Sequence, residues 1–132
     1  MNSISFSDGF LLVFAVNDWK SFEGLYQWIY SIEEKCELKK KVIIIVGNKI
    51  DSKRREVTNE EAFNFANSKN LLYFETSALT DFGIKEVFHK LFEETYKKYK
   101  ELNYKEIEKL SNKIKRKIKT VMNSKLNKFI NY

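Results

Sequence analysis

Apolar side chains gather in three short runs that are typical of buried β-strands. The runs cover residues 10–16, 42–46 and 71–74, and each is bounded by polar residues or glycine. They are continuous rather than alternating, which is the pattern of a strand covered on both faces, as in a parallel sheet. The sequence therefore predicts three strands of a parallel sheet, and no regular element is expected before Asp8.

Between and after these runs, apolar positions recur every three or four residues, as in amphipathic helices. One such stretch covers residues 22–36. A second begins at Thr58, which forms a capping-box pattern with Glu61, and a third covers residues 84–99. The alternating order predicts an α/β fold, a partial P-loop NTPase-type parallel sheet of three strands and three helices.

Beyond residue 99 the apolar stripe narrows and lysine dominates. From residue 95 onward the sequence contains twelve Lys or Arg and three Glu, which gives a net charge of +9. The whole chain of 132 residues has a net charge of only +6. We therefore divide the chain into a folded domain, residues 1–99, and a basic, helical extension, residues 100–132. The extension keeps a stripe of six apolar residues: Ile107, Leu110, Ile114, Ile118, Val121 and Met122.

Three interpretations of the extension stay open at this point. It is a solvated, partly disordered tail, an amphipathic helix that contacts an anionic membrane weakly or a partner protein, or a nucleic-acid-binding segment. Nucleic acid is the least favoured, because lysine outnumbers arginine and aromatic residues do not interleave the basic run. We expect no nucleic-acid partner.

Two polar clusters directly follow the second and third predicted strands. Residues 47–51 read GNKID, and residues 75–79 read ETSAL. In open α/β sheets, ligands bind beyond the carboxyl ends of the strands, where both clusters are expected to lie. These clusters are therefore the candidate site.

At these residues the chain resembles the Ras superfamily of small GTPases, with Ras-like and Rab-like features mixed. Residues 46–51 resemble the fourth guanine-nucleotide motif of the family and residues 75–78 the fifth. Residues 8–16 look like its fourth strand, and Trp28 stands where Rab-like members often carry tryptophan. The resemblance covers about residues 8–98 and implies GTP or GDP as ligand, with effector or regulator proteins as partners.

The chemistry of the base explains the role implied for Asp51. Guanine presents two adjacent donors, N1–H and the exocyclic amino group, which one ionised carboxylate accepts together. Adenine lacks this donor pair, so the carboxylate would be left without its partners.

The resemblance also implies roles for the residues around Asp51. Lys49 would lay its aliphatic stem over the base, and Asn48 would tie neighbouring loops together. Backbone N–H groups around Ser77 and Ala78 would donate to the guanine carbonyl oxygen. Leu79 stands where the family usually has lysine, which keeps apolar stacking and loses the charge.

The phosphate-binding parts of the family have no counterpart in these 132 residues. No G-x-x-x-x-G-K-[ST] loop occurs, and no candidate precedes the first strand for the switch residues that hold Mg²⁺ and position water. The chain looks like the C-terminal half of a small GTPase. We expect guanine recognition without hydrolysis, no catalytic residue, and Mg²⁺ only in an intact family member.

Two alternatives remain. One is a truncated gene model of an active GTPase switch. The other is a nucleotide-free interaction module that uses the surface around Trp19, Tyr26 and Trp28. A single cysteine, Cys36, suits a reducing cytoplasm, and the absence of any later cysteine predicts no prenylation, so membrane contact would be peripheral.

Overall fold

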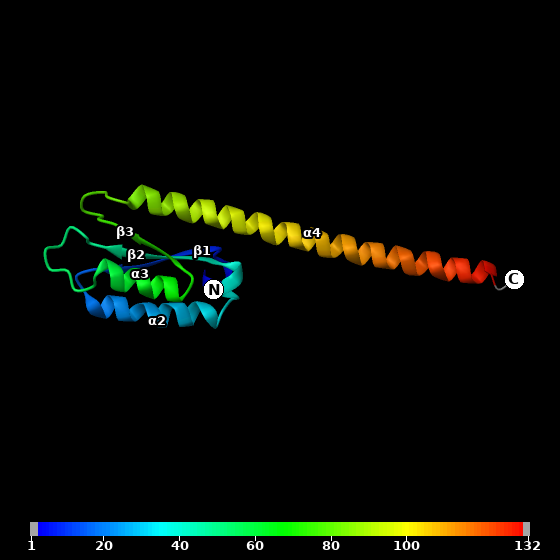
Figure 1. The fold of residues 1–132 in the computed structure, drawn as a ribbon, viewed down its shortest axis with the longest axis horizontal. Helices are drawn as coiled ribbons and strands as arrows, with labels where there is room; N and C mark the ends of the chain where they lie inside the picture. The colour runs from blue at the N-terminus through cyan, green and yellow to red at the C-terminus, as the bar shows by residue number, and fades with distance from the viewer. Residues whose placement is uncertain (1–2, 131–132) are drawn as a thin grey trace. The chain divides into compact units, whose positions relative to one another are not determined.

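The computed structural model describes residues 3–130, and its side chains are described over residues 4–123. The chain divides into two compact units, Met1–Lys98 and Tyr99–Tyr132. In chain order the elements are α1 (Ser3–Phe6), β1 (Gly9–Ala15), α2 (Trp19–Glu33), a 3-10 turn (Leu38–Lys40), β2 (Val42–Asn48), α3 (Asn59–Ser68), β3 (Leu72–Glu75) and α4 (Ile84–Ile130) (Figure 1).

The three strands form one parallel sheet in the order β1-β2-β3. Gly9 pairs with Val42 at one end of β1, and Ala15 pairs with Asn48 at the other. Parallel neighbours require crossover connections, and α2 and α3 supply them. The predicted α/β class and the three-stranded parallel sheet are therefore confirmed.

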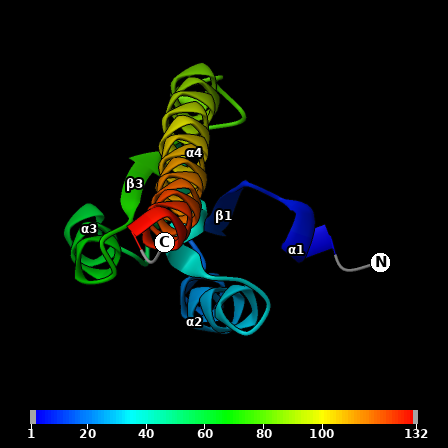
Figure 2. The same ribbon diagram turned by 90° about the vertical axis from the view of Figure 1, so that its right-hand side faces the viewer.

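Helices cover both faces of this sheet. Figure 2 shows α2 and α3 on one face and the first turns of α4 on the other. The larger cluster of buried residues lies under α2 and α3, and the smaller one under the start of α4, where Val87 packs with Ile44 and Val46. The apolar stripe of α2 is almost fully buried, and its members are Phe22, Leu25, Ile29 and Ile32.

The prediction that the strands are covered on both faces is confirmed for β2 only: no residue of β3 is fully buried and Leu72 is 40% exposed, and β1 is open on part of one face. Leu12 and Phe14 are buried, but Val13 between them is 57% exposed. Leu11 and Leu91 of α4 both pack, partly buried, against the smaller core cluster, whereas β2 is buried from Ile43 to Gly47. An edge strand has one strand neighbour only, so the covering helix leaves part of its outer face open.

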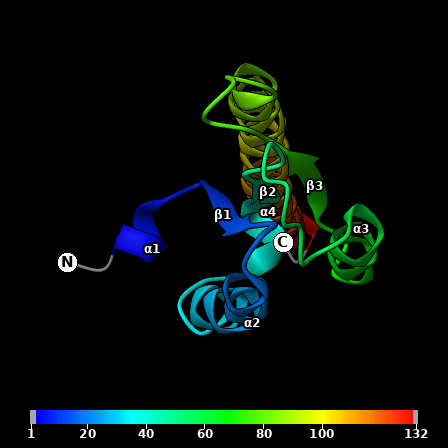
Figure 3. The same cartoon turned by 90° about the vertical axis from the view of Figure 1, so that its left-hand side faces the viewer.

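The chain before Asp8 also differs from expectation. Residues Ser3–Phe6 form a short helix, α1, which lies beside β1 (Figure 3). Ile4 packs against the larger core cluster, and the Lys41 ammonium donates a hydrogen bond to the Ser5 carbonyl oxygen at 3.4 Å. Four residues are too few to show a helical repeat, which is why the pattern did not predict this element.

The unit Tyr99–Tyr132 is α-helical as far as Ile130, as part of α4. The structure therefore has one continuous helix where the sequence suggested a helix and a separate extension. The six stripe residues of this unit are each more than half exposed: Ile107, Leu110, Ile114, Ile118, Val121 and Met122.

Candidate functional site

The loops that follow β2 and β3 meet at the carboxyl edge of the sheet (Figure 1). Thr76 donates its backbone N–H to the Gly47 carbonyl oxygen at 2.8 Å, and Ile50 donates to the Thr76 carbonyl oxygen at 3.3 Å. Between them, Lys49 adopts a left-handed backbone with φ of 64°. The two predicted polar clusters therefore lie side by side at this edge of the sheet.

Asn48, the last residue of β2, links the two loops through its side chain. Its Oδ1 accepts a hydrogen bond from Thr76 Oγ1 and another from the backbone N–H of Ala78, both at 3.1 Å. An amide oxygen has two lone pairs, and both are used here. This is the loop-tying role that the resemblance implies for Asn48.

Asp51 is held by a hydroxyl from the other loop. The Ser77 hydroxyl, in a residue only 1% exposed, donates to Asp51 Oδ1 at 2.5 Å, and the Thr80 N–H donates to the same hydroxyl at 3.2 Å. Asp51 itself is exposed. A carboxylate fixed through one oxygen keeps its second oxygen and a further lone pair for a ligand.

The backbone donors lie differently from the expectation drawn from the resemblance. Ser77 donates its N–H to the Phe82 carbonyl oxygen at 3.0 Å, and Ala78 donates to Asn48. A ligand carbonyl at Ala78 would therefore share that N–H with the Asn48 side chain. The remaining predicted site residues, Lys49 and Leu79, are exposed, and Leu79 is 83% exposed.

Glycine is required at two positions around the site. Gly83 has φ of 71°, and a Cβ there would lie 2.5 Å from the Glu75 carbonyl oxygen. A Cβ on Gly47 would lie 2.5 Å from the Tyr73 hydroxyl and 3.1 Å from the ring of Phe14. The strand that carries Asn48 can therefore pack under Tyr73 only with glycine at position 47.

An ion-pair cluster beneath the site was not predicted from the sequence. The Arg55 guanidinium pairs with the Glu75 carboxylate through both oxygens, and Arg55 Nε donates to the Val57 carbonyl oxygen at 2.6 Å. The Tyr73 hydroxyl donates to Glu75 Oε1 at 2.8 Å. These bonds join the loop after β2 to the end of β3.

Hydrogen bonding decides the ionisation of this cluster. Burial works to raise the pKa of Glu75, but hydrogen bonds from Arg55, Asn59 and Tyr73 outweigh it and hold that pKa below its usual value. Burial, together with Glu75, raises the pKa of Tyr73. Glu75 is therefore ionised, and Tyr73 is neutral, at neutral pH.

The donors and acceptors of the site fit a flat heterocycle that carries two adjacent N–H donors. The Asp51 carboxylate can accept both donors, and its orientation is set in advance by Ser77. Among the described residues no group of three His, Cys, Asp or Glu side chains could hold a metal ion. Over the same residues no helix is long and apolar enough to span a membrane.

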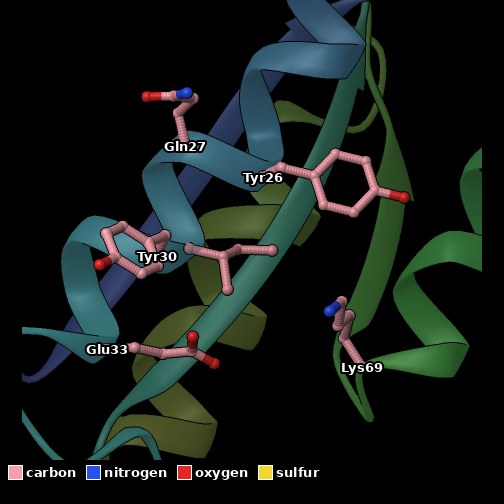
Figure 4. A pocket seen from close by; sticks show the side chains of 6 residues that line it. Tyr26, Gln27, Tyr30, Glu33 and Lys69 are labelled. Atoms are coloured by element: carbon pink, nitrogen blue, oxygen red, sulfur yellow. The ribbon is translucent and has the colours of Figure 1, made fainter.

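The aromatic surface predicted on α2 is divided between two places. Tyr26, with Tyr30 and Glu33, lines a pocket of about 450 Å³ that Lys69 faces from beyond α3, as Figure 4 shows. The Lys69 ammonium lies 5.8 Å from the centre of the Tyr26 ring. Trp28 lines a second, apolar pocket beside β1.

Trp19, the third residue of that predicted surface, lines neither of these two pockets. Its ring lies 5.4 Å from that of the core residue Phe22. The three aromatic residues therefore do not form one continuous face. Cys36 is half-buried against the larger core cluster, and His89 lies on the surface.

Comparison with known proteins places the chain beside small GTPases. The sequence model of the Ras family matches residues 1–97. The mouse Ras-related protein Rab-17 is 36% identical over 89 residues, which are 67% of this chain and 42% of Rab-17. The chain thus spans less than half the length of this curated relative.

Proposed function

This chain belongs to the Ras family of small GTPases, and from that premise we propose that its loops after β2 and β3 bind the guanine base of GDP or GTP. The observation that carries the proposal is the hydrogen bond from Ser77 to Asp51 at 2.5 Å, which orients a carboxylate toward solvent beside the Asn48-linked loops. The proposed base-binding residues are Asn48, Lys49, Asp51, Ser77, Ala78 and Leu79.

Selectivity in this proposal comes from the unused acceptors of Asp51. One carboxylate accepts N1–H and the amino group of guanine at once, whereas adenine offers an acceptor where guanine has N1–H. The aliphatic stem of Lys49 and the side chain of Leu79 would pack on the base. The Ala78 N–H, shared with Asn48, would donate to the guanine carbonyl oxygen.

Recognition of the base is separate from phosphate chemistry here. The 132 residues contain no phosphate-loop motif, and phosphoryl transfer depends on that loop, on Mg²⁺ and on a positioned water. We propose that this chain by itself binds guanine nucleotides weakly and hydrolyses GTP no faster than buffer does. A single-turnover GTP assay tests this, and Mg²⁺-dependent turnover above a protein-free control would contradict it.

The base specificity is tested by competition between GDP, ADP and XDP, with binding followed as amide shifts in NMR spectra. We expect GDP to bind at least about tenfold more tightly than ADP. In Asp51→Asn the side-chain amide can donate to the extra carbonyl oxygen of xanthine, so the preference should move from GDP to XDP.

A matched control separates this effect from a general change of charge. Asp81→Asn removes the same charge from an exposed residue in the loop after β3, where φ of 62° suits asparagine. We expect this variant to keep the preference for GDP. Equal binding of GDP and ADP by the unmodified chain would rule out the proposed function.

The alternative of a nucleotide-free interaction module on the surface around Trp19, Tyr26 and Trp28 remains a prediction, and Tyr26 of that surface lines the pocket of Figure 4. Tyr26 is 56% exposed and Tyr30 is 60% exposed beside that pocket, so a partner would find aromatic area there. The nucleotide titration discriminates between the two functions, because a module of this kind would leave the amide signals of Asp51 and Ser77 unchanged. Effectors or regulators and a cytoplasmic location likewise remain predictions.

A further inference from the structure

The unit Tyr99–Tyr132 carries an exposed apolar stripe that the proposed nucleotide site does not use. Ile107, Ile114 and Ile118 are 65%, 57% and 54% exposed, and Leu110 is 60% exposed. Steps of three and four residues place these side chains on one face of the helix. From residue 107 to residue 122 the stripe is about 24 Å long.

Basic residues border this stripe on both sides. At the angular step of an α-helix, Lys115 and Lys117 lie along its two edges, and Lys113 and Lys119 lie one position farther out. All four are exposed. Glu106 and Glu108 flank the stripe at Ile107, but from residue 109 to the end of the sequence there is no acidic residue, so the part of the stripe from Leu110 onward has only basic charges beside it.

A second copy of the same helix is a poor partner for such a face. Pairing two stripes would place Lys115 and Lys117 of one copy against lysines of the other, and like charges beside a helix seam destabilise it. Residues 107, 110, 114 and 121 fit a seven-residue repeat, but its next core position, residue 117, is Lys, and the isoleucine stands at 118 instead. The stripe therefore lacks the pattern of a left-handed coiled coil.

A lipid surface with anionic headgroups complements both features at once. Helices with lysine on the polar face and bulky apolar residues on the other lie in the membrane interface with the apolar face among the acyl chains. Lysine stems beside the stripe can extend so that the ammonium groups reach the headgroups. Nucleic acid would match the charge but would leave the isoleucine stripe in water.

We propose that residues 107–122 bind the surface of an anionic membrane as an interfacial helix. The stripe residues Ile107, Leu110, Ile114 and Ile118 enter the acyl boundary, and the flanking lysines contact the headgroups. The inference rests on this unit alone and does not depend on nucleotide binding. Each lysine near such a surface strengthens binding about fivefold, and salt weakens the effect.

The test is co-sedimentation of the full chain with vesicles of phosphatidylcholine, with or without added phosphatidylserine, at low and at high salt. Ile114→Glu places a charge in the stripe, and Asn112→Glu places the same charge two residues away on the polar face. We expect Ile114→Glu to weaken binding to anionic vesicles about a hundredfold and Asn112→Glu about fivefold or less. Circular dichroism of both variants checks that the helix persists.

Each other outcome overturns the proposal. Equal binding to neutral and anionic vesicles would remove the role of the lysines. Equal loss in the two variants would mean attraction of charge alone, with no insertion of the stripe. Binding to a duplex DNA oligonucleotide without binding to either vesicle would favour the nucleic-acid interpretation instead.

Discussion

Two helical stripes with the same spacing have opposite surroundings in this molecule. In α2, Leu25 is 1% exposed and Ile29 is 4% exposed, whereas in the unit Tyr99–Tyr132, Leu110 is 60% exposed and Ile114 is 57% exposed. Both stripes repeat every three or four residues. The difference is that α2 packs on β1 and the larger core cluster, while the second unit contains no sheet among its described residues.

The comparison shows what helical spacing determines and what it leaves open. Spacing fixes which side chains share a face, because the geometry of the helix does so. It does not say what covers that face, which depends on neighbouring elements. The charge around the stripe is more informative, since α2 has few lysines beside its apolar residues and the second unit has many.

The largest expected difference in the free energy of unfolding is between the same leucine-to-alanine substitution made in the two stripes. Leu25→Ala should lower the free energy of unfolding by about 3 kcal/mol, because it removes a buried side chain and leaves a cavity. Leu110→Ala should change it by less than about 0.5 kcal/mol, because its side chain is exposed. Urea denaturation of both variants measures the contrast, and comparable losses would mean that Leu110 is buried in solution.

The Arg55–Glu75 pair should give the next largest effect. Arg55→Met should cost about 1–2 kcal/mol at neutral pH, because it leaves a half-buried carboxylate without its cation. Arg54→Met is the matched control, since Arg54 is exposed in the same loop, and it should change the free energy of unfolding little.

The pair also has a defined pH dependence. The pKa of Glu75 is lower in the folded chain than in the unfolded one, so its stabilisation is present above the unfolded value of about 4.3 and is lost as pH falls through the folded value. The stability gap between the unmodified chain and Arg55→Met should therefore close in acid. Urea denaturation from neutral pH into acid follows the gap, and a gap that stays constant would contradict the assignment.

The sequence predicted the elements well because their signals are local. A continuous apolar run predicted β2, and the capping box at Thr58 and Glu61 predicted the start of α3. The exposure of Val13 could not be predicted, because it depends on how far another element covers the strand. For the same reason, the sequence could not place Arg55 against Glu75, twenty residues away.

In the site, the motifs identified the residues but not all of their bonds. The placement of Asp51 and Ser77 after two parallel strands was enough to expect them at one edge of the sheet. The hydrogen bond from the Ala78 N–H to Asn48, however, depends on the side-chain rotamer of the asparagine. The residue types of the two motifs do not indicate whether the Ala78 N–H binds the Asn48 side chain or a ligand.

A smaller effect is expected at the helix cap of α3. Thr58 Oγ1 accepts the Glu61 N–H at 3.2 Å, and the Glu61 carboxylate accepts the Thr58 N–H at 2.8 Å. Thr58→Ala should cost about 1 kcal/mol. Thr120→Ala, inside the C-terminal part of α4, removes a bond to the Arg116 carbonyl oxygen and should leave thermal unfolding unchanged.

The smallest effect on stability is expected at Val13, where the consequence should appear in association instead. Val13 is 57% exposed on β1, a terminal strand of the three-stranded sheet. Val13→Lys should change the free energy of unfolding by no more than about 0.5 kcal/mol, because little apolar area leaves the core.

The same substitution should reduce self-association, because an edge strand with an apolar face is a template for pairing with another chain and a lysine there opposes it. Sedimentation velocity over a range of concentrations measures this, with Val13→Thr as a β-branched, uncharged control that should keep the association of the unmodified chain. If the unmodified chain stays monomeric at every concentration, this edge of the sheet is already protected from pairing, by α1 and by its hydration. Association that persists in Val13→Lys would locate the contact elsewhere, and the exposed stripe of the second unit would then be the region to substitute, through Ile114→Glu.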